Sequence, residues 1–405
     1  MVPISDHVFW CKTLKSRNFG DDAPGRLQES IGLHGAYLAY VPDPLPPRLD
    51  LGPVTILKLS EADRALGELK GVGRMLPNPG LLIGPFLRRE AVSSSRIEGT
   101  VTDLGQLLMF ETDPEENDQT ADRVEVFNYV EALEFGLNRL KSLPVSQRLM
   151  REIHGRLMRG VRGEDKTPGE FRTRQNMIGR QGQQLREARF VPPPPPEMRV
   201  ALDELERYIG GRVSTLPTLV DLALIHYQFE TIHPFLDGNG RLGRLLISLL
   251  LCERGCLTQP LLYLSAYLEN NKDAYIDHLL EVSRSGAWIG WIEFFLDGVA
   301  IQAKEAVARC NELLDLRNLY RGRLQATSNS SKLLTLVDLL FERPAMTITG
   351  AATALGVTFR AAQQNIAKLE SQGILKEVTG RRSSRVFLAT GIVEVIERTG
   401  AYKSP

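Results

Sequence analysis

Residues 229–244 read FETIHPFLDGNGRLGR and bring a histidine, an aspartate, three glycines and two arginines into one short stretch. Residues 219–230, which lead into this stretch, place apolar side chains three and four positions apart, and this spacing predicts a helix. A second helix is predicted from residue 241 to residue 251. We therefore expect two apolar helices joined by a glycine-rich turn that carries most of the polar chemistry.

The glycines of this turn also match a dinucleotide-binding pattern. Gly238, Gly240 and Gly243 fit G-x-G-x-x-G. That fingerprint must follow a strand and open a helix inside a βαβ unit. Because the preceding segment is helical by its periodicity, we reject this interpretation.

The polar residues of the turn suit a metal-bound polyphosphate instead. Glycines let backbone amides approach an anion at the start of a helix, where the dipole favours negative charge. Arg241 and Arg244 lie three apart and share a helix face, and Asn239 adds an amide. Asp237 offers a carboxylate suited to Mg²⁺, and His233 offers a base.

The string H-P-F-x-D-G-N-G-R-x-x-R is complete from His233 to Arg244 and resembles the signature of the Fic (filamentation induced by cAMP) family. The resemblance extends over about residues 35–390. It implies a mainly α protein, with a Fic/Fido helical core, a small β-hairpin flap, an N-terminal helical region and a C-terminal winged helix-turn-helix. It also implies a protein adenylyltransferase that transfers AMP from ATP to a Ser, Thr or Tyr hydroxyl of a target protein.

The resemblance assigns roles along the signature. His233 would take the hydroxyl proton, and Asp237 would hold Mg²⁺ at the ATP phosphates. The implied nucleotide-binding residues are Asp237, Gly238, Asn239, Gly240, Arg241, Leu242, Gly243 and Arg244. Tyr275 is a candidate for the adenosine end, and a core position is the equal alternative.

An upstream motif resembles the family's inhibitory segment. SSSRIEGT contains Ser94, Glu98 and Gly99 in the pattern Ser-x-x-x-Glu-Gly. A carboxylate at Glu98 could take the guanidinium of Arg244 and exclude the γ-phosphate. The alternative is an ordinary surface glutamate.

Residues 168–196 resemble the family's flap, which grips the target. PGEFR opens the segment, and strands at 177–178 and 189–191 predict a hairpin. The target would dock on residues 176–192. Five prolines follow, and we expect them to form an extended polyproline spacer rather than a ligand for a proline-binding domain.

The C-terminal part changes character. Residues 321–405 hold twelve Lys/Arg and six Asp/Glu in a chain whose net charge is zero. The pattern predicts a winged helix, with three helices followed by two strands. The helices are expected at 333–341, from a Thr349 cap to Gly356 and from a Thr358 cap to Gly373, and the strands at 374–378 and 385–388. Four side chains would face a DNA groove, unless the element serves protein contacts: Arg360, Gln363, Gln364 and Lys368.

Four regions follow: an extension (1–30), an N-terminal region with the inhibitory helix (31–120), the catalytic core (121–320) and the winged helix (325–395). The first thirty residues look mixed and extended, and helices are predicted at 60–69, 84–97 and 103–110. The neutral charge argues against a nucleic-acid coat or a membrane-surface protein. Without an apolar leader, a spanning run or a disulfide framework among Cys11, Cys252, Cys256 and Cys310, we expect a cytoplasmic protein with no membrane partner.

Two other functions stay open. The same site could mainly remove AMP, with Glu98 positioning a water. A non-enzymatic regulator could instead sense nucleotide in the core and bind DNA through the winged helix. The sequence also leaves self-modification and a homodimer open.

Overall fold

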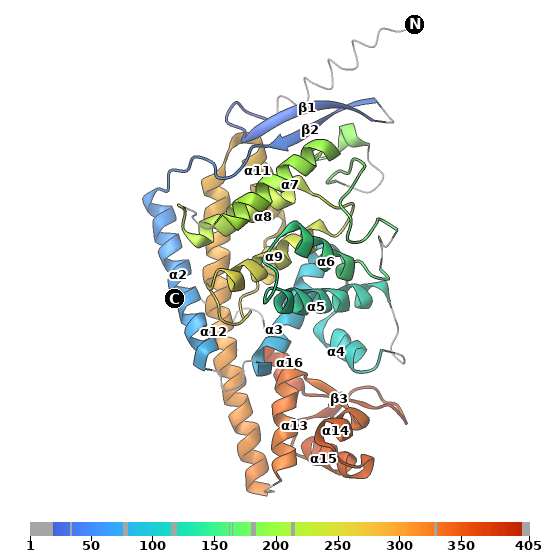
Figure 1. Cartoon of the computed structure of the whole chain (residues 1–405). Helices are drawn as coiled ribbons and strands as arrows, with labels where there is room; N and C mark the ends of the chain where they lie inside the picture. The colour runs from blue at the N-terminus through green and yellow to red at the C-terminus, as the bar shows by residue number, and fades with distance from the viewer. Residues whose placement is uncertain are drawn as a thin grey trace. The chain divides into compact units, whose positions relative to one another are not determined.

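The computed structural model describes residues 19–32, 35–75, 80–114, 120–161, 163, 165–179, 184–211, 215–327 and 330–398 (Figure 1). The chain divides into two compact units, each assembled from separate stretches. The first unit takes Met1–Asp63, Ala132–Arg254 and Asn270–Val299. The second takes Arg64–Glu131, Gly255–Glu269 and Ala300–Pro405.

Helix α8 (Thr218–Ile232) is the centre of the first unit, and its residues from Leu219 onward are buried. Helices α7 (Pro195–Gly210), α9 (Asn239–Glu253) and α11 (Lys272–Ser285) pack against it, as does strand β2 (Gly35–Pro42) (Figure 1). The indole N–H of Trp291 in α12 (Trp288–Thr327) donates to the carbonyl of Ala223 at 2.9 Å. Because α8 is buried on every side, it is a core helix rather than a surface helix with one exposed face.

Strand β1 (Gly25–Gly32) pairs antiparallel with β2, from Gly25 opposite Pro42 to Gly32 opposite Gly35. The sequence predicted only mixed, extended chain here. The strand GRLQESIG lacks a strict alternation of apolar and polar residues, so the usual period-2 signal is weak. Cys11 lies outside the described residues, whereas Cys252, Cys256 and Cys310 are not part of a disulfide bond.

The predicted flap hairpin is present in reduced form. Ile178 and Phe190 form one antiparallel bridge, with N–H to carbonyl distances of 2.9 and 3.2 Å. A short 3₁₀ turn, η1 (Leu185–Glu187), stands before the returning arm, and residues 180–183 of the predicted docking segment lie outside the described part. The proline spacer is shorter than predicted, because α7 begins at Pro195. Proline is well accommodated in a first helical turn.

The second unit contains α3 (Gly80–Ile97), α4 (Leu104–Thr112), most of α2 (Pro53–Met75), the far part of α12 and the C-terminal elements. Helix α2 is much longer than the predicted 60–69 segment, and α5 (Ala121–Arg139) bridges the two units in sequence. The short α10 (Ser265–Asn270) follows an irregular connection. Among the described residues, no helix has both the length and the apolar composition needed to cross a bilayer.

The C-terminal elements form the predicted winged helix with three differences. Helices α13 (Ser331–Glu342), α14 (Ile348–Leu355) and α15 (Phe359–Ser371) accompany a three-stranded antiparallel sheet in the order β3–β5–β4, and β3 lies between α13 and α14 in the chain. Thr347 caps α14, not Thr349, and neither β3 (Ala345–Thr347) nor α16 (Thr390–Glu397) was predicted. The other two strands are β4 (Lys376–Glu377) and β5 (Val386–Leu388).

Helix α13 packs on α3, the helix that carries the predicted inhibitory motif. A Cβ on Gly84 of α3 would lie 2.3 Å from the carbonyl oxygen of Glu342, so only glycine permits this approach. Helix α16 also packs on α3 and α4. The winged helix and the predicted inhibitory helix therefore belong to one compact unit.

Candidate active site

His233 ends α8 in the left-handed conformation, with φ 49° and ψ 61°. This conformation is uncommon for a residue with a side chain and marks a constrained position. The Nδ1 atom lies 3.1 Å from the carbonyl oxygen of Glu230. A carbonyl can only accept, so the neutral ring carries its proton on Nδ1 and keeps Nε2 as the basic nitrogen.

The turn after His233 is shaped by the side chain of Asn239. Its Oδ1 accepts from the N–H of Phe235 at 2.9 Å, and its Nδ2 donates to the carbonyl of Phe235 at the same distance. Phe235 and Asn239 are both buried. The amide of Asn239 thus closes the turn, and a phosphate contact from this residue would come from its backbone.

Two glycines are required by close packing. Gly238 has φ 74°, and a Cβ there would lie 2.7 Å from the sulfur of Met158. A Cβ on Gly243 would lie 2.1 Å from Oε1 of Glu230. These glycines let α9 start against α6 (Gln147–Leu157) and pack on α8.

Helix α9 begins at Asn239, two residues earlier than predicted, so its first-turn N–H groups lie in the signature itself. Arg241 and Arg244 project from this turn, and each is only 3% exposed. The positive helix end and the two guanidinium groups together favour an anion. Leu242 is fully buried and its N–H donates to the carbonyl of Gly238, and a nucleotide contact by this residue stays a prediction.

Asp237 is held by three groups. Its Oδ1 accepts from the N–H of Gly238 at 2.8 Å, and its Oδ2 accepts from Nζ of Lys166 at 2.7 Å. Arg241 Nη2 lies 3.9 Å from Oδ1. Burial opposes ionisation, but the Lys166 ammonium, the Gly238 N–H and Arg241 outweigh it and lower the pKa of Asp237 from its usual value. The group is therefore a carboxylate at neutral pH.

His154 of α6 connects the signature to the segment after α6 and was not predicted. Its Nε2 lies 2.9 Å from the carbonyl of Asp237, and its Nδ1 lies 2.8 Å from the N–H of Gly169. The carbonyl must accept and the N–H must donate, so the proton sits on Nε2. Burial lowers the pKa of His154 to about 4, which keeps the ring neutral.

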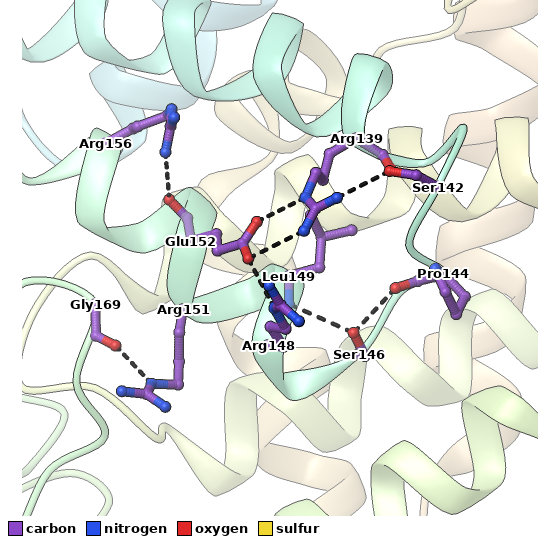
Figure 2. A network of polar contacts seen from close by, with 10 residues as sticks. All are labelled: Arg139, Ser142, Pro144, Ser146, Arg148, Leu149, Arg151, Glu152, Arg156 and Gly169. Atoms are coloured by element: carbon purple, nitrogen blue, oxygen red, sulfur yellow. Dashed lines mark hydrogen bonds and ion pairs between the residues drawn. The ribbon is translucent and has the colours of Figure 1, made fainter.

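A polar network joins α6 to the end of α5 and to Gly169 in the segment after α6 (Figure 2). Glu152 accepts from Arg139 at 2.9 Å and from Arg148 at 3.0 Å, and Ser146 caps the helix. Arg151 Nε donates to the carbonyl of Gly169 at 2.9 Å. Gly169 is thus bound to α6 through both its N–H and its carbonyl.

The flap is fastened to the signature by Arg172, a residue of the quoted PGEFR whose role was not predicted. Its side chain is 1% exposed and donates to the carbonyls of His233 at 2.9 Å and Pro193 at 2.5 Å. Asn176, also not predicted, donates to the carbonyls of His233 at 3.2 Å and Phe235 at 2.8 Å. The first arm of the flap is therefore bonded to the backbone of the predicted base, and Arg172 also joins that arm to Pro193 after the returning arm.

Tyr275 lies in the core of the first unit. It is 4% exposed, and its hydroxyl lies 2.8 Å from Nε2 of His226. Nδ1 of His226 lies 3.2 Å from the carbonyl of Gly243, so the hydroxyl donates to Nε2. Burial, with a further contribution from Arg244, lowers the pKa of His226 to about 3. Tyr275 is thus linked through His226 to the backbone of α9 at Gly243. An adenosine contact by Tyr275 stays a prediction.

The predicted inhibitory residues lie at the end of α3. Ser94 is buried in the helix, and Glu98 is exposed just after it. Gly99 has φ 100°, and its N–H bonds to the carbonyl of Arg96 at 3.0 Å. Glu98 belongs to the second compact unit and Arg244 to the first, so their pairing stays a prediction.

The donor set can be compared with what a metal would need. Across the described residues, no group of three or more His, Cys, Asp or Glu side chains could hold a metal ion. Mg²⁺ does not need such a cage, because it binds through one or two carboxylates together with phosphate oxygens and water. An ionised, 32% exposed Asp237 beside an anion-binding helix end fits that mode.

Three parts of the chain match known families. Residues 56–138 match the Fic/DOC family N-terminal region, and residues 144–251 match the Fic/DOC family. Residues 333–393 match an HTH DNA binding domain. The second of these matches contains the whole signature, with His154, Lys166, Arg172 and Asn176.

A protein adenylyltransferase Fic from Drosophila erecta is 30% identical over 147 residues, which cover 36% of this chain and 26% of the Drosophila protein. The match thus spans a small part of the curated relative. A crystal structure of a Fic family protein from Desulfovibrio desulfuricans G20 superposes with a TM-score of 0.54 at 20% identity, over 86% of this chain and 99% of that one. Fic-1 from C. elegans gives 0.51 at 19% identity, over 65% and 75% of the two chains. At these identities the two structures show a common fold.

Proposed function

We propose that the chain is a protein adenylyltransferase, because residues 56–138 match the Fic/DOC family N-terminal region, residues 144–251 match the Fic/DOC family and residues 333–393 match an HTH DNA binding domain. It would transfer AMP from ATP to a Ser, Thr or Tyr hydroxyl of a target protein. The observation that carries the proposal is the intact signature, in which a basic histidine nitrogen, a carboxylate and two buried arginines surround a helix N-terminus.

The proposed reaction follows from these groups. The target hydroxyl oxygen forms a bond to the α-phosphorus of ATP, the bond from that phosphorus to the bridging oxygen breaks, and pyrophosphate leaves. Nε2 of His233 takes the hydroxyl proton, while its Nδ1–H is held by the carbonyl of Glu230. The family's Mg²⁺, held by Asp237, would supply charge neutralisation at the phosphates.

The remaining residues would position the substrates and neutralise the charge of the phosphates. The α9 N-terminus with Arg241 and Arg244 would bind the leaving phosphates, and positioning with charge neutralisation dominates phosphoryl-group chemistry. Arg172 and Asn176 hold the His233 backbone to the flap, on which the target segment would dock. This link supports one rigid unit of base and docking surface.

The test is to incubate the chain with labelled ATP, Mg²⁺ and a cell lysate, and to include the Glu98→Gly variant. Label should appear on the chain itself, on other proteins, or on both, and more strongly with the variant. A chain that only strips AMP from labelled protein would favour the removal reaction instead. No transfer and no removal by either protein would contradict both.

We also propose that the winged helix binds duplex DNA, on two observations. Residues 333–393 match an HTH DNA binding domain, and Arg360, Gln363, Gln364 and Lys368 are exposed on α15. Helix α15 would then be the recognition helix. Fluorescence anisotropy of the whole chain with a labelled duplex should show binding that weakens steeply with salt, and an Arg360→Ala, Lys368→Ala double variant should lose most of it.

A further inference from the structure

Lys166 reaches the signature carboxylate from the connection after α6. Its Nζ lies 2.7 Å from Oδ2 of Asp237, and the two side chains are 36% and 32% exposed. The pair joins residues 71 positions apart in sequence. Nothing in the sequence pattern assigned a role to this lysine.

The surroundings of the pair fix the aspartate but not the lysine. Asp237 is held by the Gly238 N–H at Oδ1 and by His154 at its backbone carbonyl. Gly163 also lies close to this carboxylate, because a Cβ on Gly163 would be 3.0 Å from Oδ2 of Asp237. Among the described residues, the Lys166 ammonium bonds to Asp237 alone and stands at the end of a flexible four-carbon stem, so it is the half of the pair that can move.

The pair places an internal cation where a divalent cation would bind. We propose that Lys166 makes metal binding depend on nucleotide: it neutralises Asp237 until a metal–nucleotide complex arrives, and then releases the carboxylate and turns to the phosphates. The inference rests on the proposed function, in which Asp237 is the carboxylate for that cation.

The argument is one of charge exchange. Without nucleotide, a cation that takes Oδ2 of Asp237 removes from the Lys166 ammonium the carboxylate that neutralised it, and the two positive charges repel. With a triphosphate, the added negative oxygens serve both cations. By linkage, nucleotide then tightens metal binding and the metal tightens nucleotide binding by the same factor.

The chain offers a matched control. Lys58 of α2 and Asp297 of α12 form a second lysine–aspartate pair, with Nζ 2.5 Å from Oδ2 and side chains 28% and 41% exposed. Lys58→Met removes a pair of the same chemistry and similar exposure outside the signature. Lys166→Arg keeps the positive charge at the site, and thermal melts of every variant report on folding.

The experiment titrates Mn²⁺ into the whole chain and follows the free aqueous ion by electron paramagnetic resonance. Each protein is titrated without nucleotide and with α,β-methylene ATP, an analogue that cannot undergo AMP transfer. Lys166→Met should bind Mn²⁺ about two- to fivefold more tightly than wild type without nucleotide, the range expected for a partly exposed ion pair. The tightening produced by the analogue should shrink by at least that factor, whereas Lys166→Arg and Lys58→Met should behave as wild type.

Equal Mn²⁺ affinities and equal nucleotide effects for Lys166→Met and wild type would overturn the inference and leave the pair a structural one. Wild type that binds no Mn²⁺ even with the analogue would overturn the proposed function together with it. Because the first outcome retains Mn²⁺ binding and the second lacks it, the two failures are distinguishable.

Discussion

The imidazole of His154 lies flat against the ring of Phe235, with centroids 3.8 Å apart and planes inclined by 9°. Both of its nitrogens are bonded to backbone, one to the Asp237 carbonyl and the other to the Gly169 N–H. Only the neutral ring can serve both partners, since an imidazolium has no acceptor for the Gly169 N–H. A single buried histidine thus holds the signature turn and the start of the flap together.

This arrangement predicts a loss of stability in mild acid. In the unfolded chain His154 titrates near its ordinary pKa of 6.5, but in the folded chain burial lowers that pKa to about 4. As the pH falls from 6.5 towards 4, the unfolded state binds a proton that the folded state does not. Each pH unit in that window costs up to about 1.4 kcal/mol of the free energy of unfolding.

The measurement is urea unfolding at pH 7.0, 6.0 and 5.0 for wild type and His154→Asn. Asparagine has an NH2 group that donates and a carbonyl oxygen that accepts, and it does not titrate, so the variant should lose less stability per pH unit. His226, whose pKa falls to about 3, contributes to both proteins equally. Parallel pH profiles for the two proteins would show that His154 does not carry this effect.

Two glycine-to-alanine changes should have opposite effects. Gly243→Ala places a Cβ 2.1 Å from Oε1 of Glu230 and should cost about 1–3 kcal/mol, because a packed core resists added atoms. A Cβ on Gly67 of α2 would have no atom of the described residues within 4 Å, so Gly67→Ala should stabilise by up to about 1 kcal/mol. The melting temperatures of the two variants and of wild type are the measurement. A Gly243→Ala variant that melts at the wild-type temperature would contradict the packing of α9 on α8.

The signature could be interpreted from sequence because its function is local. The turn, the new helix and the polar side chains lie within the residues from His233 to Arg244, and the helical periodicity on both sides is strong. The winged helix was predictable for the same reason, since capping threonine and stop glycine punctuate it. In the winged helix, the sequence did not predict the Thr347 cap, strand β3 or helix α16.

The supporting residues could not be found in this way. His154, Lys166, Arg172 and Asn176 act on the signature from 57 to 83 positions away, through single polar contacts with no periodic pattern. A buried polar side chain gives no signal until the fold shows which backbone groups it satisfies. The PGEFR segment indicated where the flap lies in the sequence, but it did not indicate which hydrogen bonds Arg172 and Asn176 would form.

The Glu98 prediction tests the inhibitory motif. If Glu98 pairs with Arg244 as the motif implies, its carboxylate occupies the guanidinium and holds ATP out of its productive position. Glu98→Gly and Glu98→Gln should both raise label incorporation tenfold or more at matched ATP and Mg²⁺. Arg244→Ala should abolish activity in either background, and wild-type levels in both Glu98 variants would make Glu98 an ordinary surface residue.

The most direct test of the central claim compares ATP labelled at the α-phosphate with ATP labelled at the γ-phosphate, using the Glu98→Gly chain, which we expect to be more active, with and without His233→Ala. Label from the α position should become attached to protein and label from the γ position should not. His233→Ala should reduce the α signal by about 10²–10⁴, the range for a lost general base. Attachment of the γ label would show a kinase, and α transfer that survives the loss of His233 would contradict the proposed mechanism.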